Sequence, residues 1–380
     1  MEHKATHVAR YGPNDVRKEI FILTADPPET LGGVETFIRE QILGFQERGY
    51  AVRVFHRGNT GRASFLRSGG RIVRPLSDGL LGWIIGNAAQ QALHQAVVAV
   101  ISHGLVGWYP LRVPDRCKQI HFYHGTYRAY AEVMRSHISL LGYWKMKWWD
   151  TMLLTRLSGR GKMVFCNSGQ VADEVRRFFG YESHVVSLIA RGQMAPMDRA
   201  ECRRTLGLPI DALVGAFVGS LHPMKNFSMV RAIIQEFPNV HWIIALRGNL
   251  PDQPLPSPNT HLFRDVPPEM IPSVFSAADF SLCPSTYEPF GYVVPEALCC
   301  GTPVIAAPGG SSCLFLSDPP LDKLLIRDAT DLKAFLAAVS EVLSRPAFYR
   351  QLVLQYGRPR VEKWMAPANW WRRFFEVTGL

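Results

Sequence analysis

Apolar and polar positions along the chain form short apolar runs that alternate with longer stretches of helical spacing. A β-branched run at 19–25 precedes a helical pattern at 34–49 that ends at glycine, and a second apolar run follows at 52–55. The same order of strand, helix and strand returns within 213–310. This alternation predicts an α/β protein whose strands form parallel, doubly wound sheets.

The other apolar runs extend this pattern through both halves of the chain. In the first half we expect further strands at 96–102, 119–123, 163–166 and 185–189, and a helix at 171–180. In the second half we expect strands at 213–218, 241–246, 262–266, 280–283, 304–307 and 324–326, and helices at 227–237, 270–278, 292–300 and 331–344. The irregular sequence at 190–198 between the halves is the expected hinge.

The segment 280–310 combines one strand–helix–strand step with two carboxylates. Glu288 lies just before the predicted helix, Glu296 lies inside it, and Gly291 stands where the helix should begin. Backbone N–H groups at a helix start favour an anion such as phosphate, whereas carboxylates accept hydrogen bonds from sugar hydroxyls. A ligand that carries both a diphosphate and several hydroxyls satisfies both features.

The residues around these glutamates resemble a known signature. The runs Pro-Ser-x-x-Glu-Pro-Phe-Gly and Glu-Ala-Leu-x-x-Gly-Thr-Pro-Val-Ile resemble the donor site of retaining family 4 glycosyltransferases with the GT-B fold. The resemblance implies two Rossmann-like domains that face a central cleft: an acceptor-side domain at 1–190, with a helix at 364–380 crossing back onto it, and a donor-binding domain at 191–363. It implies transfer of a sugar from a UDP- or GDP-sugar to a hydroxyl of a glycan or a lipid-linked glycan precursor.

The resemblance also implies roles for single residues. Glu288 would bind and orient the donor sugar, Glu296 would hold the ribose, and Lys225 would stabilise the departing diphosphate. His124, at the end of a predicted strand, would lie near the donor sugar; the alternative is a structural histidine bonded to backbone. We count Glu288, His124 and Lys225 as candidate catalytic residues, and we expect further donor contacts from Gly32, Gly33, Gly219, Ser220, Arg264, Pro289, Phe290, Gly291 and Tyr292.

The chain departs from the family pattern at the hinge, where Arg191-Gly192-Gln193-Met194 keeps only the glycine of the usual Asn-Gly-x-Asp, and at Ser220. Ser220 stands where such proteins generally carry arginine, and a charge-assisted contact to a leaving diphosphate is worth on the order of 100-fold in rate. Either another cation compensates, with Arg191 and Arg264 as candidates, or the donor chemistry is slower or different. The alternative function is therefore a GT-B-like binding or scaffold protein that has lost transfer activity. An epimerase or phosphorylase on this fold has no supporting motif.

Composition and net charge limit the classes of partner and cofactor that we expect for this chain. The 380 residues carry a net charge of +10, which suits acidic partners such as sugar nucleotides and anionic lipids. No nucleic-acid-binding motif accompanies the charge, so we predict no nucleic-acid partner. Seven cysteines without C-x-x-C spacing, and no Asp-x-Asp pair, predict neither a metal nor a cofactor. The polar first eighteen residues do not resemble a secretory signal, and we predict a cytoplasmic protein, with peripheral attachment at the inner membrane face as an open possibility.

Two aromatic segments raise the question of a membrane. The segment 137–162 has tryptophans and leucines at helical spacing, interleaved with Lys145, Lys147 and Arg160. It predicts either a helix at a membrane surface or an amphipathic core helix with a solvated basic face. The uncharged stretch 79–111 is interrupted by polar residues and predicts a helix that does not span a membrane. Interdomain packing or a second membrane contact would explain the C-terminal cluster of Trp364, Trp370, Trp371, Phe374 and Phe375.

Overall fold

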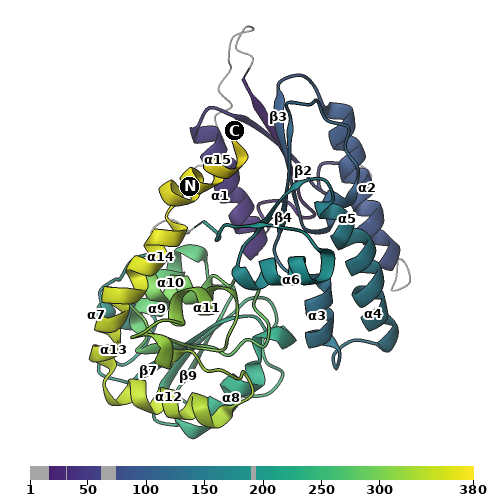
Figure 1. The fold of residues 1–380 in the computed structure, drawn as a ribbon. Coiled ribbons are helices and arrows are strands. Elements are labelled where there is room, and N and C mark those ends of the chain that lie inside the picture. Colours follow the sequence, from purple (N-terminus) through teal and green to yellow (C-terminus); the bar gives the residue numbers. More distant parts are fainter. Residues whose placement is uncertain (1–16, 31, 61–73, 190–193) are drawn as a thin grey trace.

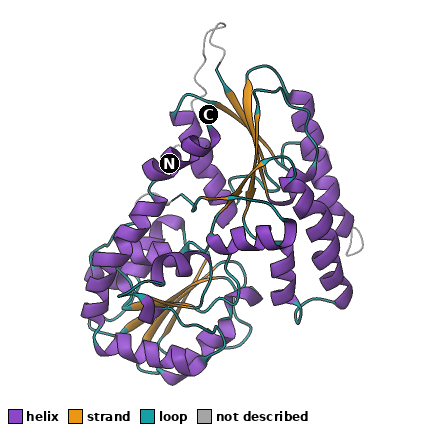
Figure 2. Cartoon of the chain, viewed as in Figure 1, coloured by secondary structure: helices purple, strands orange, loops and turns teal. Residues whose placement is uncertain are grey.

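The structure is a computed structural model of the chain, and it describes residues 17–30, 32–60, 74–189 and 194–380. Two α/β units lie one above the other in Figure 1, each built on its own sheet. Figure 2 shows helices on both faces of each sheet. The predicted architecture of two doubly wound, Rossmann-like domains is confirmed.

The first sheet is parallel throughout, with the order β2-β1-β3-β4-β5-β6. Its strands are β1 (Glu19–Leu23), β2 (Ala51–Phe55), β3 (Val97–His103), β4 (Lys118–Tyr123), β5 (Met163–Cys166) and β6 (His184–Val185). Every residue of β1 is buried, as expected for a strand covered by helices on both faces. The covering helices include α1 (Gly33–Glu47), α2 (Arg74–Ala92), α3 (Tyr127–Met134) and α6 (Gly169–Phe179).

The second sheet is also parallel, with the order β11-β10-β7-β8-β9. Its strands are β7 (Val214–Gly219), β8 (His241–Leu246), β9 (Thr260–Arg264), β10 (Phe280–Cys283) and β11 (Val304–Ala306). The helices of this unit include α7 (Arg199–Thr205), α8 (Phe227–Glu236), α9 (Ile271–Ala277), α10 (Val293–Cys299), α11 (Gly310–Leu316) and α12 (Leu332–Ser344). The strand order reverses between β7 and β10 here, and between β1 and β3 in the first sheet. Such reversal points are where open α/β sheets bind ligands.

Several predicted strands have different bounds. The predicted strand 185–189 is only the two-residue β6, although Leu188 and Ile189 are buried in the core. The predicted strand 324–326 is a 3₁₀ turn, Asp322–Leu324, followed by a single bridge from Leu325 to Ala306. In both places the apolar residues are buried but do not form a full strand. An apolar run indicates burial, and the sequence pattern alone does not distinguish a buried strand from another buried segment. The predicted strand 262–266 lies two residues earlier, as β9.

The tryptophan-rich segment is helical from 140 to 159, but its middle is not an α-helix. It consists of α4 (Leu140–Trp144), a π-helix (Lys145–Thr155) and α5 (Arg156–Gly159). Within the π-helix the hydroxyl of Thr151 donates to the Met146 carbonyl at 2.8 Å, five residues back. Both candidate readings of this segment assumed regular α-helix, so the wider turn changes which side chains face outward.

The C-terminal helices run along the second unit and end on the first (Figure 1). After α13 (Pro346–Leu352) and α14 (Arg358–Met365), helix α15 (Pro367–Thr378) lies beside α1, and the rings of Trp371 and Phe45 are 4.7 Å apart. Trp370 is fully buried, and its indole N–H donates to the Ser187 carbonyl at 2.6 Å. Packing between the units therefore explains the buried C-terminal aromatics, and a membrane contact through Trp370 or Trp371 is wrong.

Candidate functional site

A cavity of about 520 Å³ lies between the carboxyl ends of the two sheets. The first unit contributes the β1–α1 loop, the start of α1 and the end of β4. The second unit contributes the ends of β7 and β8 and the loop before α10. Both strand-order reversals open onto this cavity, which is the position expected for a ligand site in an α/β fold.

The structure brings nearly all the predicted site residues to this cavity. Its lining includes His124, Gly32, Gly33, Gly219, Ser220, Lys225, Glu288, Pro289, Phe290, Gly291, Tyr292 and Glu296. Arg264 is not part of the lining: it lies at the end of β9, is largely exposed and pairs with Asp265 at 3.3 Å. Arg191, the other candidate cation, and the first residues of the expected hinge lie outside the described residues.

The loop that carries Glu288 depends on two glycines. Gly291 has a φ of +81°, in the left-handed region, and a Cβ there would come within 2.6 Å of the Glu288 side chain. Gly310, the first residue of α11, lies against the loop so closely that a Cβ would overlap the Phe290 backbone. The Gly310 N–H donates to the Glu288 carbonyl at 2.8 Å, and the Ser311 N–H donates to the Phe290 carbonyl at 2.7 Å. Helix α11, which the sequence analysis missed, therefore fixes the loop backbone.

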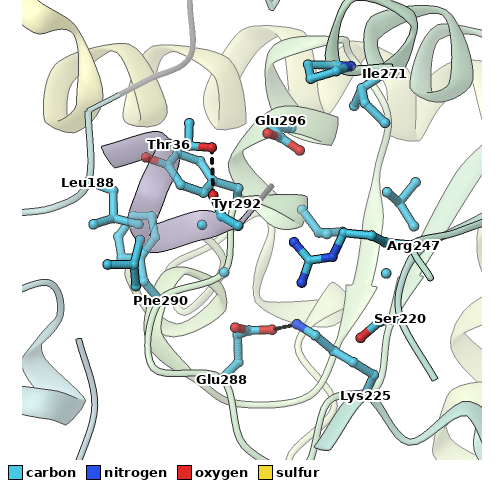
Figure 3. A pocket seen from close by; sticks show the side chains of 18 of the residues that line it. Thr36, Leu188, Ser220, Lys225, Arg247, Ile271, Glu288, Phe290, Tyr292 and Glu296 are labelled. Carbon is cyan, nitrogen blue, oxygen red and sulfur yellow. Dashed lines mark hydrogen bonds and ion pairs between the residues drawn. The ribbon is translucent and has the colours of Figure 1, made fainter. Parts of the chain in front are cut away.

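Lys225 and Glu288 form an ion pair in the cavity (Figure 3). Lys225 ends a 3₁₀ turn after β7, and its side chain is about one-fifth exposed. Burial is the largest single effect on the pKa of Lys225 and acts to lower it, but the charge of Glu288, the hydrogen bond to Glu288 and the nearby Cys283 together raise this pKa. The ammonium group is therefore charged at neutral pH and lies beside a carboxylate, close to where the sequence placed a diphosphate.

Tyr292 connects the second unit to the first, and Glu296 follows it at the start of α10. Glu296 lies in the first turn of α10, is 5% exposed and lines the cavity (Figure 3). The Tyr292 hydroxyl, just before this helix, donates to the Ile189 carbonyl at 3.1 Å. On the opposite wall, the Thr36 hydroxyl donates to the Gly32 carbonyl at 2.7 Å and fixes the glycine loop that enters α1. The two walls are thus held by hydrogen bonds to backbone carbonyls.

His124 is neither isolated nor bonded to backbone. Its Nε2 lies 3.0 Å from Nδ1 of His103, so one imidazole donates to the other. Burial lowers the pKa of His124 to about 4, and burial together with the neighbouring His124 lowers the pKa of His103 well below its usual value. Both rings are neutral at pH 7. His124 can act as a hydrogen-bonding group towards a ligand, but it does not supply a positive charge.

Arg247 is one of several cavity residues that the sequence analysis missed, with Arg39, Glu40, Asn167 and Asp265. It follows β8 directly, and Figure 3 shows its guanidinium group extending into the cavity above Ser220 and Lys225. A basic residue after a strand is common, and the sequence alone does not reveal that this strand is the neighbour of β7. Within the described part of the chain, no cluster of three or more His, Cys, Asp or Glu side chains is arranged to hold a metal ion.

Comparison with known proteins identifies the family. The model of Glycosyltransferase Family 4 matches residues 31–192, and that of Glycosyl transferases group 1 matches residues 198–357. Between them the two models account for most of both units. The chain belongs to the family 4 and group 1 glycosyltransferases with the GT-B fold.

Curated relatives match over part of their length. A D-inositol 3-phosphate glycosyltransferase of Mycobacterium leprae (strain Br4923) is 37% identical over 129 residues, 30% of this chain and 30% of the relative. That of Mycolicibacterium smegmatis is 32% identical over 164 residues, 40% of this chain and 37% of the relative. The chain therefore matches about a third of the length of these relatives.

Solved structures match over nearly the whole chain. A sucrose-phosphate synthase from Thermosynechococcus elongatus superposes with a TM-score of 0.77 at 19% identity, over 95% of this chain and 98% of that one. WaaG, a glycosyltransferase involved in lipopolysaccharide biosynthesis, superposes with a TM-score of 0.74 at 15% identity, over 95% of this chain and 100% of that one. HepE of Anabaena in complex with UDP-glucose superposes with a TM-score of 0.70 at 14% identity, over 95% of this chain and 99% of that one. At these identities the likeness establishes the fold.

Proposed function

We propose that this protein is a retaining hexosyltransferase that moves a sugar from a UDP- or GDP-sugar to a hydroxyl of a glycan or of a lipid-linked glycan precursor. The observation that carries the proposal is that Lys225, Glu288 and Glu296 meet in one cavity between two Rossmann-like units. The chemistry of this set suits a sugar diphosphate, because an ammonium attracts phosphate and carboxylates accept hydrogen bonds from hydroxyls. The complex of HepE with UDP-glucose supports a nucleotide-sugar donor.

The proposed reaction balances without a covalent enzyme intermediate. The acceptor oxygen forms a bond to the anomeric carbon while the bond from that carbon to the diphosphate oxygen breaks, on the same face of the sugar. The electron pair leaves with the diphosphate, and a phosphate oxygen takes the proton of the acceptor hydroxyl. Lys225 stabilises the charge that develops on the diphosphate, and Glu288 orients the sugar.

The neutral His124 can hydrogen-bond the sugar without adding positive charge, and the glycines at 32, 33, 219 and 291 allow the backbone to approach the ligand. We include Ser220 and the segment Pro289–Tyr292 as donor contacts on the same basis, since they line the cavity. We propose that transfer needs neither a metal nor a cofactor, because side-chain cations are available to the diphosphate. Full activity in EDTA is the expected result, and loss of activity that Mg²⁺ restores would contradict this part.

Donor turnover tests the function. The protein is incubated with UDP- and GDP-sugars, with and without glycan acceptors, and free nucleotide is measured. Glu288→Gln keeps the shape of the side chain and removes its charge, so we expect a rate at least about 100-fold lower. Glu236→Gln, in an exposed part of α8, is the matched control and should match the unmodified protein. Equal activity of the Glu288→Gln variant would refute the assignment.

A second candidate function is a binding or scaffold protein that retains the fold without transfer. The uncharged Ser220 beside Lys225 favours it. Binding of a nucleotide sugar without release of nucleotide, under every acceptor tested, would establish the second candidate and overturn the first. The anomeric configuration of the product, measured by NMR, tests retention: the product should keep the configuration of the donor.

We further propose that the protein attaches peripherally to an anionic membrane surface on the cytoplasmic side. Helix α4 and the π-helix expose an apolar face of Leu140, Leu141, Trp144, Trp148, Trp149 and Leu153, and all of these residues except Leu140 line one hollow. Tryptophan and leucine at a helix surface insert at the level of lipid headgroups, and the net charge of +10 complements anionic lipid. Within the described residues no helix is both long and apolar enough to cross a membrane.

The structure changes which residues test this attachment. Lys145 pairs with Asp150 at 3.1 Å and Lys147 pairs with Glu132 at 2.7 Å, so these lysines are neutralised locally. The apolar face is therefore the sharper target. Leu141→Gln with Trp148→Gln should abolish co-sedimentation with vesicles of phosphatidylcholine and phosphatidylglycerol, whereas Phe348→Gln, an exposed aromatic of α13, should not. Unchanged sedimentation of the double variant would contradict membrane attachment.

A further inference from the structure

Arg247 and Ser220 lie side by side at the ends of adjacent strands. Strands β7 and β8 are parallel, and Gly219 is paired with Leu246 in their register. The Arg247 N–H donates to the Gly219 carbonyl at 2.8 Å, which continues the pairing beyond β8. Arg247 therefore lies one strand away from Ser220, at the carboxyl end of the sheet, which faces the cavity.

The guanidinium group of Arg247 extends into the cavity. In Figure 3 it lies between Glu296 on one side and the pair of Lys225 and Glu288 on the other, with Ser220 below it. Its charge reaches across the cavity, since it acts on the protonation of both Lys225 and Glu35. The Arg247 side chain thus lies over the space that is surrounded by Glu296, Lys225, Glu288 and Ser220.

Side chains of both charges line the cavity. Among the described residues in its lining, the cationic side chains are Arg39, Lys225 and Arg247, and the carboxylates are Glu40, Asp265, Glu288 and Glu296. An anionic ligand therefore depends on where the cations lie and not on a net positive charge of the lining. Arg39 lies on α1, in the first unit, whereas Lys225 follows β7 and Arg247 follows β8, on the side of the cavity where Ser220 lies.

We propose that Arg247 supplies the second cationic contact to the diphosphate of the donor, in place of the charge that Ser220 lacks. A guanidinium group presents parallel N–H donors that match two oxygens of a phosphate, so one residue can hold two non-bridging oxygens. Lys225 then contacts the diphosphate from one side and Arg247 from the adjacent strand end. This proposal rests on the proposed function, because it needs a nucleoside diphosphate in the cavity.

Binding of nucleotides that differ in one phosphate tests this role. Affinities of the full-length protein for UDP and GDP, and for UMP and GMP, are measured by calorimetry. For the base that binds, Arg247→Met should weaken the diphosphate about 10- to 100-fold and the monophosphate by less than about threefold. Arg204→Met removes an exposed arginine of α7 that lies outside the cavity and is the matched control, with both affinities expected to stay unchanged.

A relocated charge separates an electrostatic role from a structural one. Adding Ser220→Arg to the Arg247→Met variant returns a guanidinium to the adjacent strand end, and we expect it to restore most of the lost diphosphate affinity. A variant Arg247→Met that keeps the full preference for diphosphate over monophosphate would overturn this inference alone. An unmodified protein that shows no preference for any diphosphate would overturn the proposed function, and this inference with it.

Discussion

Nδ1 of His103 lies 3.0 Å from Nε2 of His124, and the two rings stack at 5.2 Å between centroids. His103 ends β3 and His124 directly follows the adjacent parallel strand β4, so the sheet itself sets their separation. Because burial keeps both rings neutral, one must donate and the other accept. This pairing orients His124 at the cavity wall and makes its tautomer depend on the tautomer of His103.

The neutral state of His124 predicts how stability depends on pH. Its folded pKa of about 4 lies below the ordinary value of 6.5, so the unfolded chain binds the proton first as the pH falls. Stability is therefore fully present above about pH 6.5 and declines towards pH 4, with a loss on the order of 2 kcal/mol at pH 5 from this residue. Urea denaturation at pH 7.5 and pH 5 should show a smaller difference for His124→Asn than for the unmodified protein. An equal loss of stability between pH 7.5 and pH 5 in the two proteins would contradict a buried, neutral His124.

Tyr287, directly before Glu288, is tied to the first unit. Its hydroxyl donates to Oε2 of Glu174 on α6 at 3.0 Å, and the Thr126 hydroxyl donates to the same oxygen at 2.7 Å. Burial raises the pKa of Glu174, and these two hydrogen bonds oppose that shift. The Glu288 loop is thus anchored across the interface between the units.

Removing the hydrogen bond from Tyr287 should lower donor turnover by more than the loss of folded protein explains. Tyr287→Phe leaves the ring in place and takes one donor from a buried carboxylate, so we expect about 1–2 kcal/mol of lost stability. Because Glu288 follows in the same loop, donor turnover should fall several-fold beyond any loss of folded protein. Circular dichroism melts and turnover of the folded fraction measure the two effects. Lower stability with unchanged turnover would show that the contact does not position Glu288.

Gly310 offers a second test of the loop. A methyl group there would meet the Phe290 backbone, which cannot yield as a flexible side chain can. Gly310→Ala should therefore displace the Glu288 loop and lower donor affinity at least about 10-fold, while Gly169→Ala, at the start of α6 with open space around it, should have little effect. Wild-type affinity in the Gly310→Ala variant would show that the loop tolerates displacement.

The parts of this site that the sequence could predict lie within continuous segments. Glu288, Gly291 and Glu296 belong to one strand–loop–helix step, whose spacing is visible in the chain. Arg247 could not be assigned in this way, because its place in the site depends on which strands become neighbours in the second sheet. A cation was expected in the cavity, but the register of β7 and β8 selects Arg247 over Arg264.

The same limit applies to helical segments. Spacing alone left 137–162 open between a core helix and a surface helix, and both readings assumed 3.6 residues per turn. The π-helix between Lys145 and Thr155 turns Trp148 and Trp149 outward, with about half of each side chain exposed. Local hydrogen bonds from Thr151 and Thr155 to carbonyls five residues back accompany this turn, and hydrophobic periodicity does not detect them.

Trp370 and Trp149 provide a matched pair for the final prediction. Trp370 is fully buried between α15 and the first unit, stacks on Phe374 at 5.2 Å and donates to the Ser187 carbonyl, whereas 47% of Trp149 is exposed. Truncation of a buried tryptophan costs about 3–5 kcal/mol, so Trp370→Ala should lower the denaturation midpoint strongly. Trp149→Ala should change stability by less than about 1 kcal/mol, because an exposed side chain leaves no cavity. Urea denaturation followed by circular dichroism measures both, and similar losses for the two variants would mean that α15 does not hold the units together through Trp370.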